Sequence, residues 1–165
     1  MDLSSISPTL LVASLMVAAT PILLASIGEL VVEKSGVLNL GVEGMMIIGA
    51  IAGFAAAVGT GSPIIGFLCA ALGGAALSLV FALLTQFFLS NQVATGLALT
   101  LFGLGLSALM GQSYIGIKPP ASAKLDLPVI SDIPILGPIL FSHDITVYVA
   151  LVLVAGVWWF LKYTR

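Results

Sequence analysis

Five long runs of mostly apolar residues constrain what this chain can fold into more than any other feature of its sequence. They cover residues 9–28, 37–58, 63–89, 93–111 and 145–161. A helix of about 20 apolar residues crosses the hydrocarbon layer of a membrane and satisfies its own backbone hydrogen bonds there. The pattern therefore predicts an all-α integral membrane protein with about five transmembrane helices, of which one can be discontinuous, and one substantial external loop.

Charged residues are too scarce to coat a water-facing globule. They make up 7% of the 165 residues, whereas a soluble domain carries about 25%. The net charge of −2 offers no basic stripe for nucleic acid, so nucleic acid is excluded as a partner and membrane lipid is expected. The single cysteine, Cys69, lies in an apolar run, where it fits a small packing residue. One copy of the chain therefore holds neither a disulfide framework nor a cysteine metal cluster.

The first four runs are separated by short connectors with turn or helix-cap chemistry, "EKSG" at 33–36, "GTGS" at 59–62 and "SNQ" at 90–92. Neighbouring helices are therefore expected to run antiparallel. Residues 112–144 differ, because they hold five prolines and five charged residues. We expect this stretch to be the external loop, with a short amphipathic element at 133–141, and we interpret residues 1–165 as a single transmembrane domain.

Basic residues predict the orientation, since Lys and Arg gather on the cytoplasmic side. Lys34 lies between the first two runs, and Lys162 and Arg165 follow the fifth. Five spans place both positions inside, and the N-terminus and the 112–144 loop outside, although that loop also carries two lysines. The first run has no Lys or Arg ahead of it, so we interpret it as a retained helix. Aromatic residues typical of a membrane interface end the last run: Trp158, Trp159 and Tyr163.

Small residues recur at every fourth position in two of the runs. One series is Gly49, Gly53 and Ala57, and the other is Gly66, Ala70, Gly74 and Ser78. This spacing lets helix backbones approach closely in lipid, and packing within the chain explains it better than a dimer face. The glycine pairs 73–74 and 103/105 leave open that the third and fourth spans are re-entrant or broken.

Glu43 is the ionisable residue that most needs an explanation, because a charge at helix depth is costly and by default faces protein or water. It lies beside Asn39, Gly41 and Gly44, and we expect it a turn or two into the second span. If residues 36–44 are not a regular helix, their backbone can line a cavity, as broken helices do in transporters. Bonding of Glu43 to nearby backbone or to a neighbouring helix is an equal alternative. Three other charged residues are expected in a solvated inner turn: Glu29, Glu33 and Lys34.

The stretch "SNQVATGLALT" at 90–100 begins the fourth span with two amides. Capping by Asn91 or Ser90 is the ordinary explanation, whereas a cavity-lining role is the alternative for Gln92, Thr95 and Thr100. His143 has no second histidine near it, so we expect an interfacial side chain and no metal site. The sequence contains no catalytic motif and no phosphate-binding loop, so we expect neither a catalytic residue nor a cofactor.

The segment "GELVVEKSGVLNLGVEGMMIIGA" at 28–50 resembles the signature of permease subunits of ABC importers in the branched-chain amino acid and ribose-type superfamily. Three further stretches agree in order and spacing: "NQVATGLAL" at 91–99, "IPILGPILFSHD" at 133–144 and "WWFLKYTR" at 158–165. The closest branch is that for nucleosides or simple sugars. The resemblance implies a bacterial-type inner membrane and partnership with a second permease, cytoplasmic ATPases and an extracytoplasmic binding protein.

By position, the resemblance points to 35–44 as an irregular element near the translocation path and to 91–96 as the start of a core helix. The substrate-path candidates are Asn39, Gly41, Glu43, Gly44, Asn91, Gln92 and Thr95. ATP hydrolysis is expected on another subunit. Permeases of this kind are nearly twice as long, so we expect an N-terminal part of a longer permease. The alternatives are a non-functional or structural membrane remnant, and a small homo-oligomeric channel or carrier.

Overall fold

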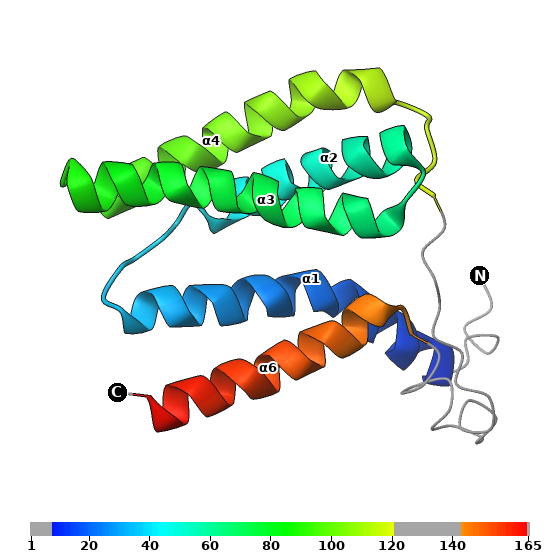
Figure 1. Ribbon diagram of the computed structural model, residues 1–165, viewed down its shortest axis with the longest axis horizontal. Coiled ribbons are helices and arrows are strands. Elements are labelled where there is room, and N and C mark those ends of the chain that lie inside the picture. The colour runs from blue at the N-terminus through cyan, green and yellow to red at the C-terminus, as the bar shows by residue number, and fades with distance from the viewer. Residues whose placement is uncertain (1–7, 121–142, 165) are drawn as a thin grey trace. The chain divides into compact units, whose positions relative to one another are not determined.

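The computed structural model describes residues 8–120 and 143–164, and the elements assigned within them are all helices. In chain order they are α1 (Pro8–Lys34), α2 (Val42–Thr60), α3 (Pro63–Ala82), the π-helix η2 (Leu83–Phe87), α4 (Gln92–Gly111), the 3-10 helix η3 (Gln112–Tyr114) and α6 (Ile145–Tyr163) (Figure 1). With η2 extending α3 and η3 extending α4, five helical stretches are long and apolar enough to cross a membrane. The predicted all-α membrane fold is confirmed.

Two helix boundaries differ from the prediction. α1 continues to Lys34, so Glu29, Glu33 and Lys34 belong to its last turns, whereas we expected them in a turn between helices. The apolar residues between these charges keep the helix going until Gly36 ends it. α2 begins only at Val42, so Glu43 lies in its first turn and is exposed. The predicted start at residue 37 was wrong, because residues 35–41 are irregular.

The described residues divide into two compact units, and the first combines residues 8–31 with residues 143–164. In this unit α1 and α6 run parallel, with their C-terminal ends pointing the same way (Figure 1). Both helices have buried positions, Thr20 in α1 and Val147 and Ala150 in α6. His143, which we expected at the interface, is 3% exposed. Asp144 is the N-cap residue of α6, and its Oδ1 accepts a hydrogen bond from the N–H of Ile145 at 3.1 Å.

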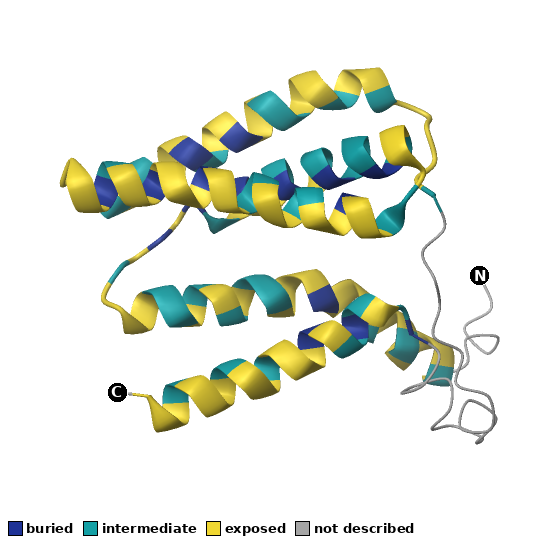
Figure 2. Ribbon diagram, in the orientation of Figure 1, coloured by how far each residue is buried: buried dark blue, intermediate teal, exposed yellow. Residues whose placement is uncertain are grey.

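The second unit covers residues 32–120, and within it α2 packs against both α3 and α4. Its buried apolar cluster joins all three helices through Met45, Leu77, Phe81 and Leu99. Buried positions recur along these helices, and exposed positions lie between them (Figure 2). Many of the exposed side chains are large and apolar. In a chain that spans a membrane, such an outer surface suits lipid or further helices.

The small-residue series in α2 and α3 face each other. A Cβ added to Gly53 would lie 2.7 Å from Ala70 Cβ and 2.8 Å from the carbonyl oxygen of Gly66, and one added to Gly66 would lie 2.7 Å from Ala57 Cβ. The predicted close packing within the chain is therefore confirmed. Gly73 lies within continuous α3 and packs against Ala52, so these glycines shape the helix surface and do not break the helix.

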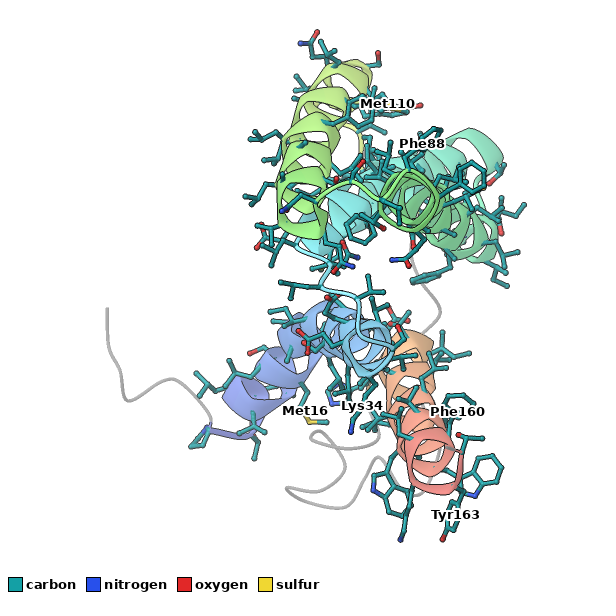
Figure 3. The ribbon with its side chains drawn as sticks, turned by 90° about the vertical axis from the view of Figure 1, so that its left-hand side faces the viewer. Met16, Lys34, Phe88, Met110, Phe160 and Tyr163 are labelled. Atoms are coloured by element: carbon teal, nitrogen blue, oxygen red, sulfur yellow. The ribbon has the colours of Figure 1, made fainter. Side chains whose placement is uncertain are left out.

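Two helix ends have distinct local structures, and the sequence pattern predicted only the aromatic one at the end of α6. η2 widens the last turn after α3, where the N–H of Phe88 donates to the carbonyl of Leu83 at 3.1 Å, and Leu89 follows with a φ of +54°. Phe88 therefore lies at the tip of this helix, and Tyr163 projects from the end of α6 (Figure 3). The Nζ of Lys162 lies 4.7 Å from the ring centre of Trp158, as suits a cationic and aromatic helix end at a membrane interface.

The expected single domain over 1–165 and the external position of 112–144 stay predictions. η3 begins the predicted loop, and its continuation through 121–142, including the amphipathic element expected at 133–141, lies outside the described residues.

Candidate functional site: the irregular segment at 35–41 and the start of α2

The candidate site begins where the backbone leaves α1. Gly36 has a φ of +86°, a left-handed conformation that favours glycine. The N–H of Gly36 donates to the carbonyl of Glu33 at 2.9 Å, and the N–H of Val37 donates to the carbonyl of Val32 at 3.3 Å. This pair of bonds is the Schellman motif, which satisfies the free carbonyls at a helix end. The motif explains why the chain turns at 35–36 although apolar residues continue beyond it.

Asn39 is the buried polar residue of the segment, with 6% of its surface exposed. Its Oδ1 accepts a hydrogen bond from the N–H of Gly41 at 2.9 Å. Its Nδ2 lies 3.5 Å from Sδ of Met45, a member of the apolar cluster. The side chain therefore folds the segment back on itself just before α2 and ties it to the core of the second unit.

Two side chains of α4 hold the backbone of the segment from the other side. Oε1 of Gln92 accepts a hydrogen bond from the N–H of Leu38 at 2.8 Å. The hydroxyl of Thr100 donates to the carbonyl of Leu40 at 3.1 Å. A backbone segment that leaves the helical ladder in an apolar surrounding needs such partners, because unpaired peptide groups there are costly.

Glycines bring the segment and the first turn of α2 into direct backbone contact with α4. A Cβ added to Gly96 would lie 2.8 Å from the nitrogen of Gly41, and one added to Gly103 would lie 2.8 Å from Cα of Gly44. One added to Gly44 would lie 2.6 Å from the carbonyl oxygen of Leu99. Side chains at these positions would therefore push the two backbones apart.

The structure brings some of the predicted residues together and separates others. Asn39, Gly41 and Gly44 are buried against α4 or the core, and Gln92 reaches the same segment. Glu43 stands apart as an exposed residue in the first turn of α2, where an acidic side chain suits the helix dipole.

The two amide side chains at the start of α4, Asn91 and Gln92, bond to different parts of the chain. Asn91 caps the helix, because its Oδ1 accepts from the N–H of Ala94 at 3.0 Å, and this prediction is confirmed. Thr95 is half-buried one turn into α4. Sequence reasoning missed Gly96. It lies four positions after Gln92 and four before Thr100, and this spacing places all three residues on one face of a helix. Within the described residues, no group of three or more His, Cys, Asp or Glu could hold a metal ion.

Comparison with known proteins gives a consistent result. The family model for the permease component of branched-chain amino acid transport systems matches residues 11–165. The chain is 40% identical over 148 residues to a putative glucose ABC transporter permease protein, TsgC13, of Haloferax volcanii, with 87% of this chain and 45% of that protein covered. No solved structure matches the chain.

Two bacterial relatives are also similar. The guanosine ABC transporter permease protein NupQ of Bacillus subtilis is 31% identical over 166 residues, with 94% of this chain and 52% of that protein covered. The nucleoside ABC transporter permease protein NupC of Lactococcus lactis is 29% identical over 168 residues, with 94% of this chain and 53% of that protein covered. The chain thus spans about half the length of the curated relatives it matches.

Proposed function

The chain belongs to the family of permease components of branched-chain amino acid transport systems, and from this membership we propose that it forms part of the translocation path of an ATP-driven importer. Its five apolar helices and its family make it a multi-pass protein of the plasma membrane. A nucleoside or simple sugar is the proposed substrate class, supported by relatives named for glucose, guanosine and nucleosides. A second permease subunit, cytoplasmic ATPases that hydrolyse ATP and an extracytoplasmic binding protein complete the proposed importer.

The observation that carries the proposal is the irregular backbone at 35–41 between two helices long enough to span a membrane. Such backbone occurs at membrane depth where it is buried in protein or lines a water-filled cavity, and helix ends beside it are the usual substrate sites of transporters. Glu43 lies at such a helix end and is exposed, and Asn39 shapes the turn that precedes it. We therefore place Glu43 closest to the solute.

The remaining candidates support the path in other ways. Gly41 and Gly44 let the segment approach α4, and Asn91 and Gln92 use their side-chain oxygens on backbone N–H groups. Thr95 is proposed as a further path residue, because it is half-buried near the start of the same helix.

Replacement of the Glu43 carboxylate tests the proposal. We would measure uptake of labelled guanosine and glucose by cells that express the chain together with its partner subunits. A hydrogen bond to a charged group contributes about 1.5–3 kcal/mol, so Glu43→Gln is expected to raise the substrate concentration for half-maximal uptake about ten- to hundredfold. Glu33→Gln is the matched control, because Glu33 is an exposed acid in the last turn of α1.

Two results would count against the proposal. Equal uptake by the Glu43→Gln and Glu33→Gln variants would remove Glu43 from the path. Uptake into liposomes that contain the chain alone would point to a self-contained channel or carrier.

A further inference from the structure

Three residues of α4 face the irregular segment at intervals of four. Gln92 bonds to the N–H of Leu38, Gly96 lies against the backbone of Leu40, and Thr100 bonds to the carbonyl of Leu40. Residues four apart lie on one side of a helix, one above the other. One stripe of α4 therefore meets the main chain of the segment through two hydrogen bonds, with a glycine contact between them.

The two hydrogen bonds from α4 replace some of the backbone hydrogen bonds that the segment would make if it were helical. In a helix, the N–H of Leu38 and the carbonyl of Leu40 would pair with backbone groups of the same helix. In the structure, a side-chain amide and a hydroxyl from 54 and 60 positions along the chain supply partners for these groups. Gly96 is necessary to this arrangement, because a Cβ there would lie 2.9 Å from the nitrogen of Leu40.

We propose that Gln92 and Thr100 are positioning residues, which hold the backbone of residues 38–41 in its non-helical shape and so set where α2 and Glu43 begin. Both side chains bond to main-chain atoms of the segment, so neither needs to touch a solute. Only the consequence for transport rests on the proposed function. The positioning itself rests on the two hydrogen bonds and the glycine contact, all of which lie within one compact unit.

Hydrogen–deuterium exchange of the purified full chain, resolved by peptide, tests the positioning. Thr100→Val removes the hydroxyl at nearly constant volume, and Gln92→Leu removes the acceptor. Loss of a hydrogen-bond partner favours local opening of the backbone, so exchange in residues 36–44 is expected to rise about fivefold or more in each variant. Thr100→Ser keeps the hydroxyl and is expected to restore the slow exchange of the parent chain.

Exchange in α3, residues 63–82, which takes part in neither bond, separates positioning from general unfolding. A rise confined to 36–44 supports the proposal. No rise in 36–44, or an equal rise in residues 63–82 for both variants, would overturn it. Failure of Thr100→Ser to differ from Thr100→Val would overturn the role of the hydroxyl.

Uptake by the assembled importer then separates this proposal from the proposed function. If the segment lines the path, Thr100→Val is expected to lower uptake at least about fivefold, and Thr100→Ser to restore it. A rise in exchange with unchanged uptake would leave the positioning intact and remove residues 38–41 from the path. Unchanged exchange would refute the positioning whatever the uptake.

Discussion

A single methyl group at Gly103 is expected to destabilise the chain, whereas the same group at Gly105 is not. In Gly103→Ala the new Cβ would lie 2.8 Å from both Cα and the carbonyl oxygen of Gly44. These two are backbone atoms, which no rotamer change can move. To reach 3.4 Å, where ordinary van der Waals contact begins, α2 and α4 must separate by about 0.6 Å. A gap of that size forfeits about a quarter of the dispersion energy of each contact that it opens.

Gly105 provides the matched control, because it lies in the same helix and a Cβ there meets nothing within 4 Å. Alanine improves helix propensity by about 1 kcal/mol at either position, so this gain cancels between the two variants. What remains is the cost of overpacking, about 1–3 kcal/mol. For a chain of this length, that corresponds to a melting temperature about 2–12 °C lower for Gly103→Ala than for Gly105→Ala.

Thermal unfolding of the two purified variants in the same detergent, followed by the loss of the monodisperse chromatographic peak, would measure this difference. Equal melting temperatures would refute the reasoning, because they would mean that α2 and α4 do not approach each other through Gly44 and Gly103. A higher melting temperature for Gly103→Ala would show in addition that the space beside it is open.

The same physics gives two further predictions. Gly53→Ala is expected to lower the melting temperature relative to Gly59→Ala, because only the first Cβ meets α3, at 2.7 Å from that of Ala70. Equal melting temperatures would contradict the close α2 and α3 packing. Asn91→Ala is expected to destabilise the chain by about 1 kcal/mol in chemical unfolding, because the N–H of Ala94 loses its partner. Asn91→Ser should recover most of the loss, and a Ser variant as unstable as the Ala variant would show that the cap contributes nothing.

The number and type of the helices could be predicted from the sequence, because a membrane imposes a minimum length of apolar residues on each span. The positions of the helix ends were predicted less accurately. The prediction ended the first helix before Glu29 because charge was taken to mean a turn, whereas three apolar residues carry the helix on to a glycine with positive φ. The π-turn at Leu83–Phe87 is not encoded in residue type, and no local pattern distinguishes it from the helix before it.

In the candidate site, local chemistry was predictable and long-range contact was not. The cap at Asn91 follows from its position beside the first residues of α4, and the structure has it. The bond between Leu38 and Gln92 joins residues 54 positions apart, and the contact of Gly41 with Gly96 leaves no side chain to signal it. A path role for Glu43 stays a prediction.

The contact between Gly44 and Gly103 also limits how α2 and α4 can move. Most helix contacts consist of side chains that can change rotamer and so pass between alternative packings. At Gly44 and Gly103 the two main chains touch directly, with no side chain between them to rearrange. The contact therefore offers one spacing only, and the two helices can turn about it but cannot exchange it for another. In the importer that we propose, this contact is expected to act as a pivot, which joins the first turn of α2 to α4 while the far end of α2 moves.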